Sequence, residues 1–425
     1  MSAWTLERAQ SHLLSLELFG MRLGLERMHR LLAELGSPQA RLRAVHVVGT
    51  NGKSSTVRMT AAVLEAHGLR TGAFLSPHLQ SFAERIRIGG EDLDGDLFAA
   101  AVQRAAEAAE VVESDLEPGD RVTQFELLTA AALSELAARE VDVAVIEAGL
   151  GGRHDATNVL GAPVVVLTSV GLEHTRWLGE TVAEIAREKL AVVGDGATLV
   201  VGALEPGAMA QAEATAARRA ARIVSVAGVA RYPGERDGSA GDAPRDPALP
   251  GYQRTNFALA LAACEALIGE LDDERVAAAR AHVSVPGRLH AVGEDPVVIF
   301  DGAHNPPGIA ALIDALEEMV GERAIVPVIS VLDDKDAGGM LAQLLPRSVA
   351  AVLTRTDNPR AMGVEELREL AVRGDWEIRT EPDPRRALEL ARRLAGPRGA
   401  VLVTGSLHLV GELLAGSEAR VASAL

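Results

Sequence analysis

A short stretch near residue 50 combines glycines, a lysine and hydroxyl side chains in a spacing that suits phosphate binding. Gly49 and Gly52 give the backbone freedom to turn its N–H groups toward an anion. Lys53 adds positive charge for phosphate oxygens, and the hydroxyls of Ser54 and Ser55 can reach a phosphate or a metal ion. The whole stretch reads Val45-His46-Val47-Val48-Gly49-Thr50-Asn51-Gly52-Lys53-Ser54-Ser55-Thr56.

The elements on either side are those that a phosphate loop needs. Residues 45–48 form a short apolar run rich in β-branched side chains, which is typical of a buried parallel strand. A helix over residues 56–67 would direct the positive end of its dipole at the anion. Val47 stands where the generic G-x-x-x-x-G-K-[ST] pattern has its first glycine, so the loop is a shorter form. The alternative is a glycine turn that only joins strand to helix.

Three polar side chains follow other apolar runs that we predict to be strands. Because the carboxyl ends of parallel strands meet at one edge of a sheet, we expect the three to share a metal site. The alternative for each residue needs no metal: the serine would only form a turn, the acid would only face solvent, and the histidine would have only a structural role. The three are Ser76 after residues 72–75, Glu147 after residues 141–146, and His174 after residues 164–168.

Lys189 continues the apolar face of a predicted helix over residues 181–193. Val182, Ile185 and Ala186 define that face, and position 189 follows at helical spacing. Burying a charged lysine costs free energy, so burial would lower its pKa and make the neutral amine reactive. The alternative is a side chain that extends to solvent.

Composition limits the class of protein. The chain has 425 residues, of which 48% are hydrophobic, which suggests two domains with sizeable cores. A net charge of −17 and 3% aromatic residues argue against binding to nucleic acid or to anionic membranes. The single cysteine, Cys264, excludes a disulfide framework and a thiolate zinc site. The start of the chain lacks the apolar core of a signal peptide, and we find no membrane-spanning run, so we expect a cytoplasmic protein.

The order of strands and helices predicts an α/β protein with two domains. Residues 1–290 would form a P-loop-containing, mainly parallel sheet with flanking helices. Residues 291–425 would form a smaller, Rossmann-like α/β domain. It begins with a strand over residues 297–300 that leads into the polar motif Asp301-Gly302-Ala303-His304-Asn305-Pro306-Pro307.

Several stretches resemble the folylpolyglutamate synthase and dihydrofolate synthase family, within the Mur ligase superfamily. The resemblance covers nearly the whole chain in the expected order. The stretches are Phe19-Gly20-Met21-Arg22-Leu23-Gly24-Leu25, Gly49-Thr50-Asn51-Gly52-Lys53, Ser76-Pro77-His78-Leu79, Glu147-Ala148-Gly149-Leu150-Gly151-Gly152-Arg153, Asp155-Ala156-Thr157-Asn158, Arg187-Glu188-Lys189, Pro286-Gly287-Arg288, Asp301-Gly302-Ala303-His304-Asn305-Pro306 and Thr404-Gly405-Ser406-Leu407.

The resemblance implies a monomeric ATP-dependent amide ligase that uses two Mg²⁺ ions. A carboxylate of folate or dihydropteroate would take the γ-phosphate of ATP, and L-glutamate would then attack the acyl phosphate. Lys53, Lys189 and His304 would be catalytic, with Lys189 carbamylated to help hold the second Mg²⁺. The implied contacts are Gly49 to Ser55, Asn256, Arg288 and Asp301 for ATP; Ser76, Glu147 and His174 for Mg²⁺; Thr123, Phe125 and His154 for the pterin end; and Arg288, His304 and Ser406 for glutamate.

Other functions stay open at this stage. A Mur-type UDP-N-acetylmuramoyl peptide ligase and a nucleotide-binding regulator are the two alternatives. The sequence also departs from the family pattern at Ser54, where the family usually has Gly, and at Glu173, where it usually has Asp. Leu190-Ala191 replaces the usual Ala-Gly, and residues 225–255 look irregular. These departures leave the choice between folate and dihydropteroate open.

Overall fold

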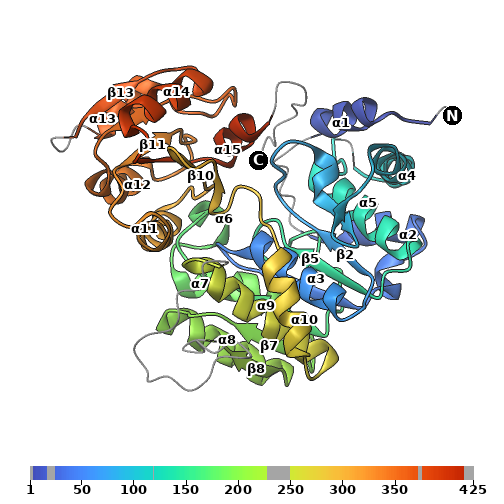
Figure 1. Ribbon diagram of the computed structural model, residues 1–425. Coiled ribbons are helices and arrows are strands. Elements are labelled where there is room, and N and C mark those ends of the chain that lie inside the picture. Colours follow the sequence, from blue (N-terminus) through green and yellow to red (C-terminus); the bar gives the residue numbers. More distant parts are fainter. Residues whose placement is uncertain (1–2, 17–23, 118, 227–248, 372–375, 416–425) are drawn as a thin grey trace.

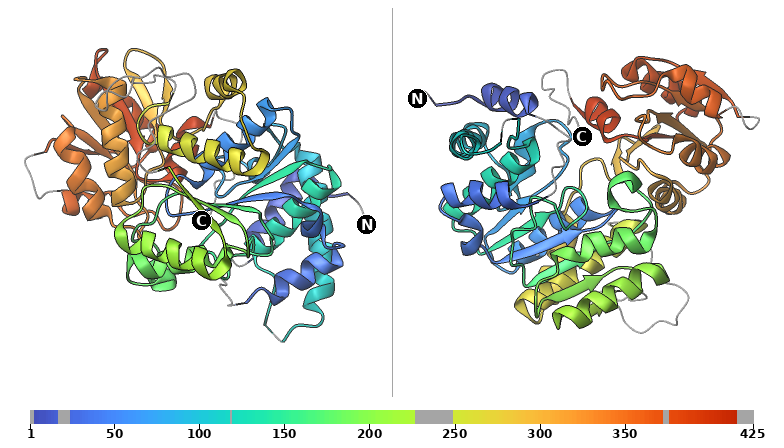
Figure 2. Two further views of the ribbon diagram at one scale, coloured as in Figure 1. Left: turned by 90° about the horizontal axis from the view of Figure 1, so that it is seen from below. Right: turned by 180° about the vertical axis from the view of Figure 1, so that it is seen from behind.

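The strands of the chain form two separate sheets, and helices cover both faces of each sheet (Figure 1). The computed structural model describes residues 3–16, 24–117, 119–226, 249–371 and 376–415. Two sequence features therefore lie outside the described residues, wholly or in large part: the Phe19–Leu25 motif and the irregular segment 225–255. Seen from two further sides, the two α/β domains lie next to each other (Figure 2).

The first sheet has eight strands, and all pair in parallel except the two at one edge. β1 lies near the centre, between β5 and β6, so the phosphate loop that follows it opens at the middle of the sheet edge. In spatial order the strands are β4 (Glu91–Asp92), β3 (Ile86–Ile88), β2 (Thr71–Phe74), β5 (Val143–Glu147), β1 (Ala44–Val48), β6 (Val164–Leu167), β7 (Thr198–Val201) and β8 (Arg222–Ser225).

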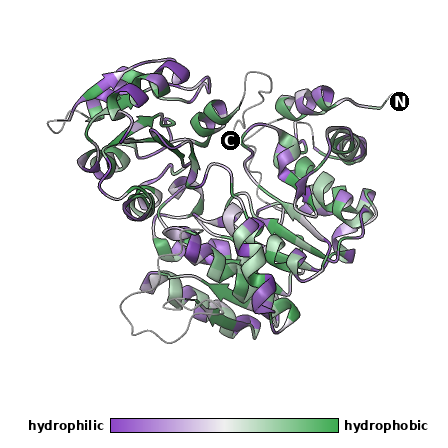
Figure 3. Ribbon diagram, in the orientation of Figure 1, coloured by the Kyte–Doolittle hydropathy of each residue, from purple (hydrophilic) through white to green (hydrophobic). Residues whose placement is uncertain are grey.

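Alternate side chains of these strands enter two different hydrophobic cores, as the period of two in a strand requires. In β5, Ala144 and Ile146 pack on one face, and Val143 and Val145 pack on the other. Hydrophobic colour accordingly dominates the strands in Figure 3. The first face carries α1 (Leu6–Ser15), α2 (Glu26–Glu34), α4 (Gly95–Glu113), α5 (Gln124–Ala138), α7 (Val182–Lys189) and α8 (Pro206–Arg219), and the second carries α3 (Lys53–Ala66), α9 (Tyr252–Ile268) and α10 (Asp273–His282).

The second sheet has six strands, five of them parallel and the edge strand β9 antiparallel. Its order is β13 (Ile378–Thr380), β12 (Ala351–Leu353), β11 (Ile325–Ile329), β14 (Ala400–Thr404), β10 (Val297–Phe300) and β9 (His290–Val292). One face carries α11 (Pro306–Val320), α12 (Ala337–Leu344) and α13 (Val364–Ala371), and the other carries α14 (Pro384–Ala395) and α15 (Leu407–Leu414).

The predicted fold class is confirmed by this pair of sheets and their helices. The domain boundary between residues 290 and 291 stays a prediction, and β9 of the second sheet begins at His290. Two local expectations need correction: Glu147 is the last residue of its strand rather than the residue after it, and the predicted helix 181–193 ends as an α-helix at Lys189. Among the described helices, none is both long and apolar enough to cross a lipid bilayer.

Candidate active site

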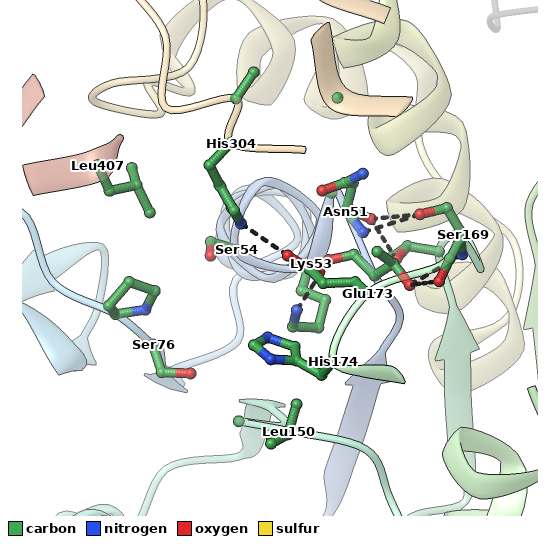
Figure 4. Close-up of a pocket in the computed structure, with 18 of the residues that line it drawn as sticks. Asn51, Lys53, Ser54, Ser76, Leu150, Ser169, Glu173, His174, His304 and Leu407 are labelled. Carbon is green, nitrogen blue, oxygen red and sulfur yellow. Dashed lines mark hydrogen bonds and ion pairs between the residues drawn. The ribbon is translucent and has the colours of Figure 1, made fainter. Parts of the chain in front are cut away.

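A cavity of about 1260 Å³ lies where the carboxyl edge of the first sheet meets the second domain. Figure 4 shows Lys53, Ser76, His174 and His304 around this space. Most residues that the sequence singled out line it. They are Thr50, Asn51, Gly52, Lys53, Ser54, Ser55, Ser76, Thr123, Phe125, Glu147, His154, His174, Asn256, Arg288, Asp301, His304 and Ser406. Gly49 and Lys189 are not among the lining residues.

Both glycines of the phosphate loop are required by the space around them. Gly52 has a φ of +87°, and a Cβ there would lie 2.5 Å from Asn256 Oδ1. Gly49 has a φ of +154°, and its Cβ would lie 1.9 Å from Thr168 Oγ1. Any larger side chain at either position would therefore have to move the loop away from its neighbours.

Hydrogen bonds from the segment after β6 hold the loop in place. Thr50 N–H donates to Ser169 O at 2.8 Å, and Asn51 N–H donates to Ser169 Oγ at 3.0 Å. The Thr168 hydroxyl donates to Asn51 O at 2.7 Å. Lys53 Nζ donates to Thr50 O at 3.2 Å and lines the cavity at the start of α3. The loop is thus supported by the neighbouring strand before any ligand binds.

Glu147 connects the phosphate loop to the loop after β2. Its carboxylate accepts hydrogen bonds from the Ser54 hydroxyl at 3.0 Å and from Ser76 N–H at 3.1 Å. The side chain is almost fully buried. Burial raises the pKa of the Glu147 carboxyl, although the nearby Lys53 and the two hydrogen bonds counteract this in part. Ser54, where the family usually has glycine, therefore supports the proposed metal ligand directly.

His174 reaches the cavity from a different position than expected. β6 ends at Leu167, and His174 lies beyond it with a φ of +50°, at the start of the short helix α6 (Thr175–Leu178). Solvent reaches the ring, but the protein around it and the positive charge of Lys335 lower its pKa to about 4. At neutral pH the imidazole is therefore uncharged, which is the form that binds a metal ion.

Lys189 lies beneath the phosphate loop. It is 4% exposed, so the alternative of a solvent-extended side chain is wrong. Its Nζ donates to Gly49 O at 2.8 Å. Burial, followed by repulsion from Lys53, lowers the pKa of the amine from 10.5 to about 7. A substantial fraction of neutral amine is therefore present near neutral pH.

One part of the cavity is apolar and aromatic. Phe125 packs against Phe74 with their ring centroids 5.8 Å apart, and Gly149 leaves room for the Phe125 ring. Thr123 caps α5 and forms a capping box with Glu126. His154 is exposed at the edge of this region. A flat aromatic group would find a matching surface here.

Asp301 joins the two domains beside the cavity. Its carboxylate accepts hydrogen bonds from Leu289 N–H and Ala303 N–H, each at 2.9 Å, and from the Tyr252 hydroxyl of α9. Arg288 also lines the cavity, and its positive charge acts on Glu147. Asp301 and Arg288 can therefore contact a ligand that sits on the phosphate loop.

Two further interactions cross between the domains. Asn51 of the phosphate loop and Asn305 exchange amide hydrogen bonds of 3.0 and 3.1 Å. Glu173 lies 3.3 Å from His304 Nε2 and 3.0 Å from Lys335 Nζ. Ser406, at the start of α15, accepts a hydrogen bond from His408 N–H at 3.1 Å. The phosphate loop thus faces the predicted glutamate contacts across the cavity.

The chemistry of Ser76, Glu147 and His174 fits a divalent cation. A cation beside Glu147 would compensate a carboxylate that burial otherwise disfavours. Among the described residues, no group of three or more His, Cys, Asp and Glu is arranged to hold a metal by itself. One carboxylate, one hydroxyl and one imidazole leave positions for water and phosphate oxygens, as Mg²⁺ prefers.

Some lining residues were missed by sequence reasoning. Lys335 belongs to the polar run of residues 333–336, which three residues separate from the end of β11, so it gave a weaker signal than Glu147. Asp155 was quoted only as part of a motif; burial raises its pKa, and it accepts hydrogen bonds from Leu150 N–H at 2.7 Å and Thr157 N–H at 3.0 Å. Tyr252 had no sequence signal, because its partner Asp301 lies in the other domain.

Comparison with known proteins identifies relatives over nearly the full length. Residues 287–407 match the family model described as Mur ligase, glutamate ligase domain. The chain is 36% identical to the dihydrofolate synthase/folylpolyglutamate synthase of Mycobacterium tuberculosis, over 91% of this chain and 88% of that protein. Relatives of this name favour the folate prediction over the Mur-type peptide ligase.

Solved structures give the same result. Folylpolyglutamate synthase of M. tuberculosis complexed with ADP has a TM-score of 0.87 at 33% identity, with 96% of this chain and 97% of that chain covered. Escherichia coli FolC in complex with DHPP and ADP has a TM-score of 0.85 at 31% identity, with 97% of both chains covered. A bifunctional folylpolyglutamate synthase/dihydrofolate synthase with Mn, AMPPNP and L-glutamate bound has a TM-score of 0.83 at 31% identity, again with 97% of both chains covered. The predicted family is therefore confirmed, and the chain belongs to the folylpolyglutamate synthase/dihydrofolate synthase family of ATP-dependent ligases.

Proposed function

We propose that this chain joins L-glutamate to a carboxylate of dihydropteroate, of folate, or of both, at the expense of ATP. The observation that carries the proposal is the interdomain cavity, in which the phosphate loop faces His304 and Ser406. Amide formation requires a nucleotide, a carboxylate and an amine to be held next to one another. The ADP, DHPP, AMPPNP and L-glutamate bound by the related enzymes support the same ligands here.

In the proposed reaction, the substrate carboxylate attacks the γ-phosphorus of ATP and ADP leaves. The amine of L-glutamate then attacks the acyl phosphate, phosphate departs, and the amine loses a proton as the amide forms. Lys53 and the N–H groups at the start of α3 stabilise negative charge on the phosphate oxygens. The second domain covers the intermediate and keeps water away from it.

In this proposal, each of the remaining candidate residues contacts one or more of four ligands: Mg²⁺, ATP, the pterin and glutamate. Ser76, Glu147 and His174 would hold Mg²⁺, which would supply positive charge to the phosphate oxygens. The nucleotide would contact residues 49–55, and the pterin end would lie on the aromatic part of the cavity. The other contacts would be Asn256, Arg288 and Asp301 for ATP; Thr123, Phe125 and His154 for the pterin; and Arg288, His304 and Ser406 for glutamate.

A carbamate on Lys189 is part of the proposal. The neutral amine would add to carbon dioxide and release one proton, which gives an anionic group able to help hold a second Mg²⁺. The pKa of about 7 and the burial of Lys189 support this chemistry. Protein equilibrated with ¹³C-labelled carbon dioxide should show a carbamate carbon signal that is lost in Lys189→Ala. The variant should also lose ligase turnover and regain part of it when short carboxylates are added.

The acceptor-resolved turnover assay tests the proposed function. Phosphate release from ATP is measured with L-glutamate and, separately, with dihydropteroate, folate or no acceptor. We expect glutamate-dependent turnover with at least one of the two acceptors. Turnover only with a UDP-sugar peptide would support the Mur-type alternative instead, and tight ATP binding without any acceptor-dependent turnover would support the regulator.

Four broader predictions accompany this function. A monomeric state stays a prediction. The net charge of −17 supports small-molecule partners rather than nucleic acid. A cytoplasmic location and a division into residues 1–290 and 291–425 stay predictions.

A further inference from the structure

Glu173 of the first domain contacts two loops of the second domain at once. Its Oε1 lies 3.0 Å from Lys335 Nζ and 3.3 Å from His304 Nε2. Figure 4 shows His304 directed toward this carboxylate. One carboxylate oxygen of Glu173 therefore contacts a nitrogen from each of the two loops.

The two loops are separated within the second sheet. His304 follows β10 and Lys335 follows β11, and β14 lies between these strands. The other ring nitrogen of His304, Nδ1, lies 2.8 Å from Gly302 O. The His304 ring is thus held at both nitrogens, and a single carboxylate of the first domain connects loops on either side of β14.

The lysines of this chain are concentrated at the site. Only three lysines occur among its 42 lysine and arginine residues: Lys53, Lys189 and Lys335. Lys53 and Lys335 line the cavity, and Lys189 lies under the phosphate loop. Lys53 Nζ contacts Thr50 O of the phosphate loop, and Lys335 Nζ contacts Glu173, so each domain contributes one lysine to the cavity. A compact ammonium group suits a mobile phosphate oxygen better than a planar guanidinium does.

We propose that Glu173 is a positioning residue that holds His304 and Lys335 of the second domain at the cavity that the phosphate loop lines. The inference rests on the proposed function and deepens it. Donors that are oriented before the substrates bind lose less entropy when the acyl phosphate and glutamate meet them. Glu173 itself touches neither substrate in this scheme.

A second ion pair between the domains provides the control. Arg254 of α9 contacts Glu318 of α11 through two hydrogen bonds of 2.6 and 2.7 Å. Neither residue lines the cavity. Glu318→Gln therefore weakens a contact between the domains without disturbing His304 or Lys335.

The test uses the full chain labelled with ¹³C at the lysine ε-carbon, which gives three lysine signals. Glu173→Gln keeps the side-chain length but removes the charge, and Glu173→Asp keeps the charge but shortens the reach. In both variants we expect the Lys335 signal to move toward that of a solvent-exposed lysine. We also expect kcat/KM for L-glutamate to fall about ten- to hundredfold, the effect of losing hydrogen bonds to a charged group. The Kd of an ATP analogue should stay within about twofold, since the loop contacts remain.

Glu318→Gln and the Lys335 signal distinguish the role of Glu173 from a general weakening of the domain interface. Glu318→Gln should leave both the Lys335 signal and kcat/KM unchanged. An unmoved Lys335 signal in both Glu173 variants would overturn the proposal, as would an equal loss of kcat/KM in Glu318→Gln. Should no acceptor support turnover, the proposed function fails, while the Lys335 signal still tests the role of Glu173. Thermal unfolding shows whether each Glu173 variant folds. If one does not fold, the Lys335 signal of the other variant tests the proposal.

Discussion

Lys189 shows how its surroundings change the chemistry of one side chain. The sequence placed it on an apolar helix face, and in the structure it is buried with one hydrogen bond, to Gly49 O. Burial and Lys53 lower its pKa to about 7. An ordinary lysine is almost fully protonated at that pH, so only the folded chain provides a neutral amine here.

This pKa predicts a pH dependence of stability. Between about pH 7 and the ordinary pKa of 10.5, the unfolded chain keeps the Lys189 proton and the folded chain loses it. The free energy of unfolding should therefore rise with pH across this window, by up to about 1.4 kcal/mol per pH unit from this group. Lys189→Met should remove that part of the slope, as measured by urea unfolding at several pH values in buffer free of carbon dioxide, which keeps the Lys189 amine uncarbamylated.

A control on the same helix separates this effect from general changes in α7. Arg187 is an exposed residue of the same helix. Arg187→Met should therefore leave the pH slope unchanged. Equal slopes in the parent chain and in Lys189→Met would show that the amine is charged in the folded protein.

At the scale of elements, the phosphate loop depends on how β1, α3 and α9 fit together. Gly52 ends the loop in a left-handed conformation directly against Asn256 of α9. Gly68, just after α3, has the same φ of +87°, but a Cβ at that position would meet nothing within 4 Å. Alanine variants of Gly52 and Gly68 would share the cost of the left-handed backbone, but only the Gly52 variant would crowd the site.

We predict that Gly52→Ala weakens ATP binding by at least about tenfold, because its Cβ would push Asn256 or the loop out of place. Gly68→Ala should carry a similar backbone cost of about 1–2 kcal/mol in stability and leave ATP binding unchanged. Calorimetric titration with an ATP analogue and urea unfolding measure the two effects. Unchanged ATP affinity in Gly52→Ala would mean that the loop adapts without loss.

At the scale of the whole molecule, three sets of polar contacts between the two domains lie at the cavity, and the Arg254–Glu318 pair lies outside it. Asn51 pairs with Asn305, Glu173 pairs with residues of two loops, and Tyr252 donates to Asp301. These contacts fall at the phosphate loop, at the predicted glutamate contacts and at the predicted nucleotide contact. The arrangement of the domains therefore also sets which residues meet at the site.

Tyr252→Phe removes one hydrogen bond between the domains without adding a charge. In Tyr252→Phe the buried Asp301 carboxylate keeps its two backbone donors but loses the third. We expect the free energy of unfolding to fall by about 1.5–3 kcal/mol, the usual value for a hydrogen bond to a charged group. Ser114→Ala, which removes an exposed local hydrogen bond to Val111 O, should change it by less than about 0.5 kcal/mol. A Tyr252→Phe value no larger than that of Ser114→Ala would contradict the prediction.

Short strands at the sheet edges escaped the sequence analysis for a physical reason. β3, β4, β8, β9 and β13 are two to four residues long and partly or fully exposed, so they carry no long apolar run. The central strands β1, β5 and β6 are buried along their length and were predicted within a few residues. A strand that is buried on both faces requires a run of apolar residues, whereas a short edge strand does not.

The sequence by itself determined the phosphate loop, the α/β class and the family, because each depends on residues that are close together along the chain. Only the tertiary structure decided which distant groups meet. Lys189 reaches Gly49 across 140 positions, and Glu173 reaches Lys335 across 162. The lowered pKa of Lys189, the uncharged state of His174 and the engagement of Glu173 all follow from such meetings. Desolvation and Coulomb interactions act through space, so they appear only once the chain has folded.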